Sequence, residues 1–122
     1  MNILVTGGLG FIGSNFILHL IQNYPDIKII NIDAEVLGSN KKNLLHIKNK
    51  NYKYFKANIT NKKLLEKLIP QVDSVINFAA ESHVDRSIRD SEPFLKSNIL
   101  ALTFNRLKNG PTASIFFTSS II

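Results

Sequence analysis

Three glycines spaced three residues apart, Gly7, Gly10 and Gly13, stand between an apolar run and a helical pattern. The run at residues 2–6, NILVT, is typical of a β-strand, and apolar residues at helical spacing predict a helix over 11–23. A glycine turn in this context favours binding of a diphosphate, because the free amides of the first helical turn point at the anion. Gly7 is expected to permit the tight turn, Gly10 the approach of a pyrophosphate, and Gly13 the packing of the helix on the sheet.

An acidic residue supports this interpretation. Asp33 follows the second predicted strand and lies 20 residues after Gly13. A carboxylate at that place accepts hydrogen bonds from the adenosine ribose hydroxyls and repels a 2′-phosphate. No arginine lies near Asp33, which favours NAD over NADP, although Lys41 and Lys42 are cations in the same region.

The rest of the chain alternates β-rich runs with helical patterns. One helix is predicted at 60–69, begun by Thr60 or Asn61 and ended by Pro70, and another at 91–108. Strands separated by helices form parallel sheets that are covered on both faces. We therefore expect class α/β and a Rossmann-type, doubly wound parallel sheet. Its five strands, in the order 3-2-1-4-5, are predicted at residues 2–6, 28–32, 51–57, 73–80 and 114–118.

Composition narrows the class of protein. The chain has no cysteine and its three histidines are scattered, so we expect neither a disulfide nor a metal site. No apolar run approaches the ~18 residues of a membrane span. The N-terminus lacks the pattern of an export signal, so we expect a cytoplasmic protein. Nine lysines and one acid, Glu66, lie between positions 41 and 67, and we interpret these lysines as a solvated face rather than a nucleic-acid patch.

Two segments carry a more specific signal than glycine spacing. ILVTGGLGFIGSNF at 3–16 and FAAESHVDRSI at 78–88 closely resemble the nucleotide-sugar 4,6-dehydratases of the extended short-chain dehydrogenase/reductase superfamily. The resemblance runs through about the first hundred residues, the N-terminal third of such an enzyme. It implies NAD as the cofactor, a nucleotide sugar such as dTDP-glucose as the substrate, and a 4-keto-6-deoxy sugar as the product.

The resemblance also implies which residues hold the cofactor. Asn58 stands where the family has an aspartate that accepts from the adenine amino group, and the asparagine carbonyl can still accept. Ser82 matches a position that touches both cofactor and substrate, and Ser97 matches one that contacts NAD. The full set of expected NAD-binding residues is Gly7, Gly10, Phe11, Ile12, Gly13, Asp33, Ala34, Glu35, Val36, Asn58, Ile59, Phe78, Ala79, Ala80, Glu81, Ser82 and Ser97.

The catalytic positions of the family are filled differently here. Ser120 stands at the position that binds the sugar, whereas Ile121 and Ile122 stand where an Asp and a Glu act as acid and base. An alkyl side chain exchanges no protons, so the elimination machinery is expected to be absent. The chain also has two Tyr-x-x-x-Lys strings, at 24–28 and 52–56. Neither is expected to form a catalytic pair, because the first contains a proline and the second lies in a strand that separates its ends by roughly 13 Å.

Three hypotheses follow. The leading one is a truncated nucleotide-sugar 4,6-dehydratase, whose residues 1–122 form an incomplete NAD-binding domain without a substrate domain and bind NAD without turnover. A nucleotide-sugar 4-epimerase is an alternative, favoured by TSS at 118–120. A catalytically inactive dinucleotide-binding module is another. An apolar fifth strand at the edge of the sheet would favour association of copies, as a homodimer or by edge pairing.

Overall fold

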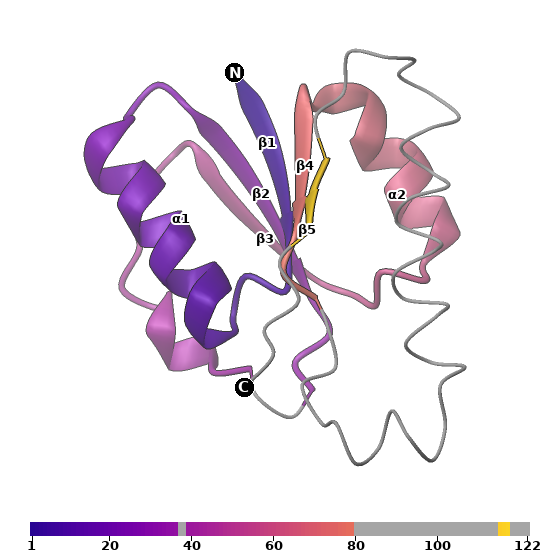
Figure 1. Cartoon of the computed structure of the whole chain (residues 1–122), viewed down its shortest axis with the longest axis horizontal. Helices are drawn as coiled ribbons and strands as arrows, with labels where there is room; N and C mark the ends of the chain where they lie inside the picture. Colours follow the sequence, from indigo (N-terminus) through magenta and orange to yellow (C-terminus); the bar gives the residue numbers. More distant parts are fainter. Residues whose placement is uncertain (37–38, 80–114, 118–122) are drawn as a thin grey trace.

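The computed structural model describes residues 1–36, 39–79 and 115–117. In these ranges strands and helices alternate along the chain (Figure 1). The elements are β1 (Asn2–Thr6), α1 (Phe11–Asn23), β2 (Lys28–Asp33), the 3-10 turn η1 (Lys41–Asn43), β3 (Tyr52–Lys56), α2 (Lys62–Leu68), the 3-10 turn η2 (Ile69–Gln71), β4 (Ser74–Asn77) and β5 (Ile115–Phe117).

The described strands form one parallel sheet in the order β3-β2-β1-β4-β5. β1 is central, with Ile3 opposite Ile29 of β2 on one side and Ser74 of β4 on the other. The order of the first four strands confirms the doubly wound arrangement expected from the sequence. β5, a strand of three residues, pairs with the outer side of β4.

The two helices α1 and α2 cover opposite faces of the sheet (Figure 1). Successive side chains of a strand point to opposite faces, so β1 serves both cores. Ile3 and Val5 pack with Ile17 of α1, whereas Leu4 packs with Leu65 of α2. Burial on both faces explains why the sequence of β1 is a continuous apolar run rather than an alternating one.

The helix bounds follow local signals. α1 occupies the range expected from its apolar spacing. α2 is shorter than the expected 60–69, because Asn61 caps it by accepting a hydrogen bond from the Leu64 amide at 3.2 Å. Pro70 lies in the 3-10 turn η2, which follows α2 directly. The helix expected at 91–108 lies outside the described residues.

Buried polar side chains concentrate where α1 begins. Among the described residues the buried polar or charged side chains are Thr6, Ser14, Asn31, Asp33 and Asn77. They come from the carboxyl-terminal halves of β1, β2 and β4 and from the first turn of α1. Because a buried polar group is costly unless it is hydrogen-bonded, this edge of the sheet must hold a connected polar network.

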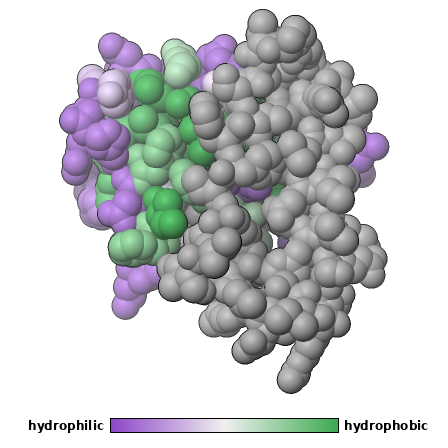
Figure 2. Space-filling view, viewed as in Figure 1, coloured by the Kyte–Doolittle hydropathy of each residue, from purple (hydrophilic) through white to green (hydrophobic). Residues whose placement is uncertain are grey.

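The surface of the described part is mixed in polarity. In Figure 2 apolar side chains form a band that polar side chains border. Phe11 and Ile12, in the first turn of α1, are 76% and 40% exposed, beside the glycine turn. No helix within residues 1–36 and 39–79 is long and apolar enough to cross a membrane.

Candidate dinucleotide-binding site

The expected site residues gather at one edge of the sheet. The strands are parallel, so their carboxyl ends meet at the same edge, which is the lower one in Figure 1. The residues at or after these ends, or at the start of α1, are Gly7, Gly10, Phe11, Ile12, Gly13, Asp33, Ala34, Glu35, Val36, Asn58, Ile59, Phe78 and Ala79. The remaining candidates lie outside the described residues: Ala80, Glu81, Ser82, Ser97, Ser120, Ile121 and Ile122.

Gly7 makes the tight turn that its spacing predicts. Its φ is 69°, a left-handed conformation that favours glycine. A Cβ on Gly7 would lie 2.5 Å from the backbone nitrogen of Ala79, so the chain after β4 passes directly against this turn. The Gly7 amide donates to the carbonyl of Ile32 at 2.8 Å, which ties the turn to β2.

The other glycines of the loop have different neighbours. A Cβ on Gly13 would lie 2.4 Å from the carbonyl oxygen of Gly7, so Gly13 allows α1 to approach the loop itself rather than the sheet. A Cβ on Gly8, which the spacing did not single out, would lie 2.1 Å from Oδ1 of Asn31. Among the described residues, a Cβ on Gly10 would meet only the Gly7 carbonyl, at 3.4 Å. Gly10 is therefore the one position of the four where the described part of the chain leaves room for a methyl group.

The first turn of α1 presents backbone donors at this loop. Gly10 is the N-cap and contributes no side-chain cap to the helix. The amides of the following turn have no intrahelical acceptor, and they carry the positive end of the helix dipole. α1 has 13 residues and begins after the loop 7–10 that follows β1, so the loop and helix form a surface suited to an anion.

Asp33 hydrogen-bonds both to the glycine loop and to the turn after β2. Its side chain is 3% exposed. Oδ2 accepts from the Leu9 amide at 2.9 Å, and Oδ1 accepts from the Glu35 amide at 2.8 Å and from the Ser39 hydroxyl at 2.7 Å. A carboxylate offers about four acceptor positions, and donors within the described residues fill three of them. Asp33 thus lies at the mouth of the glycine loop and also holds that loop in place.

Two buried asparagines support the loop, and the sequence did not identify either. Asn31 is fully buried in β2, where Oδ1 accepts from the Gly8 amide at 3.1 Å and Nδ2 donates to the Tyr52 hydroxyl at 3.1 Å. Asn77, at the end of β4, accepts from the Thr6 hydroxyl and, at 3.1 Å, from the Ala79 amide. The second bond turns the backbone after Asn77, which ends β4 before the expected position 80. The sequence signal that could have identified both asparagines is a polar residue at a buried position of an otherwise apolar strand.

The segment after β4 approaches the loop with its backbone. The Phe78 amide donates to the Thr6 carbonyl at 2.8 Å. The centre of the Phe78 ring lies 5.3 Å from the centre of the Phe16 ring on α1. The Phe78 side chain therefore belongs to the core beneath α1. Ala79 is the residue of this segment that borders Gly7.

The residues after β3 already make contacts within the protein that a ligand would have to replace. Asn58 Oδ1 accepts from both the amide and the hydroxyl of Thr60, each at 2.9 Å. An adenine amino group would have to compete with Thr60 for this oxygen. Ile59 is 6% exposed and is therefore buried in the protein.

Glu35, two residues after Asp33, forms ion pairs with two lysines. Its carboxylate accepts from the Tyr54 hydroxyl at 2.6 Å and pairs with Lys56 at 3.1 Å and Lys41 at 3.6 Å. The Tyr54 hydrogen bond, and after it Lys56, lower the pKa of Glu35, so the residue is ionised at neutral pH. Burial and the hydrogen bond to Glu35 raise the pKa of Tyr54.

Neither Tyr-x-x-x-Lys string forms a catalytic pair. Tyr24 ends α1 and Lys28 begins β2, so the first string spans a turn. Tyr52 and Lys56 are the two ends of β3. Burial raises the pKa of Tyr52, which is opposite to the change that a general base needs. The structure thus places the first string across a turn and the second along one strand, as expected.

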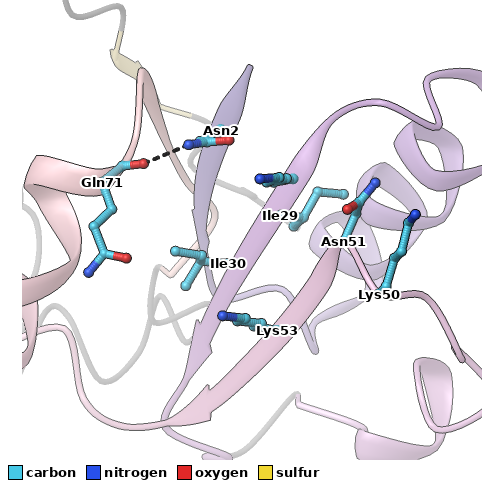
Figure 3. A pocket seen from close by; sticks show the side chains of 8 residues that line it. Asn2, Ile29, Ile30, Lys50, Asn51, Lys53 and Gln71 are labelled. Carbon is cyan, nitrogen blue, oxygen red and sulfur yellow. Dashed lines mark hydrogen bonds between the residues drawn. The ribbon is translucent and has the colours of Figure 1, made fainter.

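A shallow pocket lies at the opposite edge of the sheet. It is lined by Asn2, Lys28, Lys50 and Lys53, among others, near the amino ends of β1, β2 and β3 (Figure 3). Asn2 donates from Nδ2 to the carbonyl of Gln71 at 2.9 Å across this edge. None of the candidate residues that the structure describes lines the pocket. In parallel α/β sheets ligands bind at the carboxyl ends of the strands, so we assign the site to the glycine-loop edge.

Residues 4–108 match the family described as GDP-mannose 4,6 dehydratase. A dTDP-glucose 4,6-dehydratase of Mycobacterium tuberculosis is 36% identical over 108 residues, which are 88% of this chain and 32% of that protein. The chain thus spans about a third of the length of the curated relatives that it matches.

Solved structures resemble the fold closely. The dTDP-glucose 4,6-dehydratase of Bacillus anthracis, solved in complex with NAD, is 39% identical, with a TM-score of 0.76 over 94% of this chain and 36% of that one. The UDP-glucose 4-epimerase of Thermotoga maritima, solved with UDP-glucose, is 31% identical, with a TM-score of 0.73 over 88% of this chain and 33% of that one.

Proposed function

This chain belongs to the GDP-mannose 4,6 dehydratase family, and from that premise we propose that it is the NAD-binding part of a nucleotide-sugar 4,6-dehydratase. The reaction that we propose for the enzyme is the conversion of dTDP-glucose to its 4-keto-6-deoxy derivative. The similarity to dTDP-glucose 4,6-dehydratases supports this choice. We also propose that β5, which pairs with β4, is the fifth strand of the doubly wound sheet.

One observation carries the proposal: a glycine-rich loop, whose Leu9 side chain is buried, leads into the first turn of α1 and is tied to a buried aspartate. Side chains at Gly7, Gly8 and Gly13 would collide with the protein itself, so packing requires glycine at these positions. Asp33 binds the Leu9 amide within that loop. A diphosphate fits against the amides, and an adenosine ribose fits beside the carboxylate.

The residues of this chain bind and orient the dinucleotide. When bound, NAD supplies the acceptor for a hydride from the sugar. The amides of α1 would fix the diphosphate, Asp33 would fix the ribose, and Gly10 would leave room for the close approach of both. Ala79 would border the dinucleotide where β4 ends.

We expect the 122-residue chain to bind NAD without turnover, because Ile121 and Ile122 offer no proton to exchange. Calorimetry with NAD should give a saturable heat, whereas incubation with NAD and dTDP-glucose should give no 4-keto product. Formation of that product would contradict the assignment of the two isoleucines. Absence of binding heat at millimolar protein would contradict the proposed function.

A nucleotide-sugar 4-epimerase is the second candidate. It is favoured by the 31% identity and TM-score of 0.73 with the T. maritima epimerase, and Ser120 agrees with it. Turnover of UDP-galactose by this chain would select the epimerase. Binding of NAD with no turnover of either sugar nucleotide fits an inactive dinucleotide-binding module as well, and association of copies through β5 would favour that module.

A further inference from the structure

Glu35 is placed so that it pairs with two lysines, Lys56 and Lys41, two residues after Asp33, the aspartate proposed to bind the ribose. Lys56 ends β3 directly opposite Asp33 in the sheet, and Lys41 lies in η1. Both lysine side chains are largely exposed, at 66% and 59%, whereas that of Glu35 is only 22% exposed. Both ammonium groups converge on this one carboxylate.

The backbone holds Glu35 in this position. Its φ of 56° is left-handed, which is uncommon for a residue with a side chain. The Glu35 amide donates to Asp33 Oδ1 at 2.8 Å, and this bond supports the unusual conformation. Tyr54 then fixes the carboxylate from β3, and the Lys41 ammonium lies 5.9 Å from the centre of the Tyr54 ring. Asp33 and Glu35 are therefore parts of one hydrogen-bonded turn.

Cations at this place decide between the two dinucleotides. NADP differs from NAD by a 2′-phosphate on the adenosine ribose, and a basic side chain near the ribose-binding acid accommodates that group. Lys41 and Lys56 are such side chains. Because both pair with Glu35, their positive charge is partly offset by its carboxylate.

We propose that Glu35 is a specificity-determining residue, which selects NAD by withholding Lys41 and Lys56 from the 2′-phosphate of NADP. The inference rests on the proposed function, since it concerns the ribose end of the same site. Asp33 repels the phosphate directly, whereas Glu35 acts through the two lysines.

The test is Glu35→Gln, with NAD and NADP affinities measured by calorimetry. Glutamine retains an oxygen for the Tyr54 hydroxyl but removes the charge, so the variant is expected to fold and the affinities for both dinucleotides can be compared. The preference for NAD over NADP should fall about tenfold, because two cations near the phosphate become available. High salt should reduce this shift, since exposed charges are screened. Replacing both lysines by methionine in the same variant should restore the preference.

The matched control is Glu66→Gln, which removes the same charge from the surface of α2. It should leave the preference unchanged. An unaltered preference in Glu35→Gln with NAD still bound would overturn this inference alone. An equal loss of NAD and NADP binding would also overturn it, because that result marks a purely structural residue. Failure of the unaltered chain to bind either dinucleotide would instead contradict the proposed function, and the inference with it.

Discussion

Gly7→Ala is expected to lower the free energy of unfolding by about 3–5 kcal/mol, since the left-handed φ and the overlap with neighbouring backbone each cost on the order of 1–3 kcal/mol. The new Cβ would lie 2.5 and 2.7 Å from the backbone nitrogen and Cα of Ala79. Neither of these atoms belongs to a side chain that could rotate away. The loss should appear in urea unfolding as a much lower midpoint, together with loss of NAD binding.

Gly10→Ala is the matched control, because within the described residues its Cβ would meet only the Gly7 carbonyl, at 3.4 Å. It should fold with a loss of about 1 kcal/mol or less. NAD binding should nevertheless weaken, since the methyl group would stand where the diphosphate approaches. Equal stability of Gly7→Ala and Gly10→Ala would contradict the packing of the loop against Ala79.

Asp33→Ala should have the second large effect. It removes the acceptor of the Leu9 and Glu35 amides and of the Ser39 hydroxyl. The backbone amide of the buried residue Leu9 then loses the carboxylate that accepts its hydrogen bond. Each unsatisfied buried donor costs roughly 1–3 kcal/mol, so we expect a total loss of about 3 kcal/mol in unfolding free energy. NAD binding should become undetectable by calorimetry, because both the ribose acceptor and the shape of the loop are lost.

Asp33→Asn separates the two roles. The amide keeps the size of the carboxylate, but its NH₂ group must face at least one of the three donors. We expect a folded protein whose NAD affinity is at least about tenfold lower. Asp26→Asn removes the same charge from an exposed turn between α1 and β2 and should bind NAD normally. Unchanged affinity in Asp33→Asn would show that this carboxylate does not bind the ribose.

The sequence predicted the features that depend on local patterns. The spacing of Gly7, Gly10 and Gly13 located the loop, and the apolar period over 11–23 located α1 at the bounds that the structure shows. Asp33 was expected at the mouth of the loop because strand length and helix length fix its distance along the chain. These features follow from residues close to one another in the sequence.

What the sequence could not predict depends on contacts between distant elements. The spacing did not single out Gly8, whose amide donates to the side chain of Asn31, 23 residues away. Glu35 was expected only as one of the NAD-binding residues, because its partners Tyr54 and Lys56 come from another strand. Thr60 competes for the oxygen of Asn58, which side-chain chemistry alone left available to adenine.

The most direct test of the account is an amide chemical-shift titration of the ¹⁵N-labelled chain with NAD. If the dinucleotide binds between the glycine loop and Asp33, the largest shifts will fall on residues 7–13 and 33–36, with smaller ones after β3 and β4. No shifts on saturation, or shifts confined to the amino edge around Lys28, Lys50 and Lys53, would contradict it.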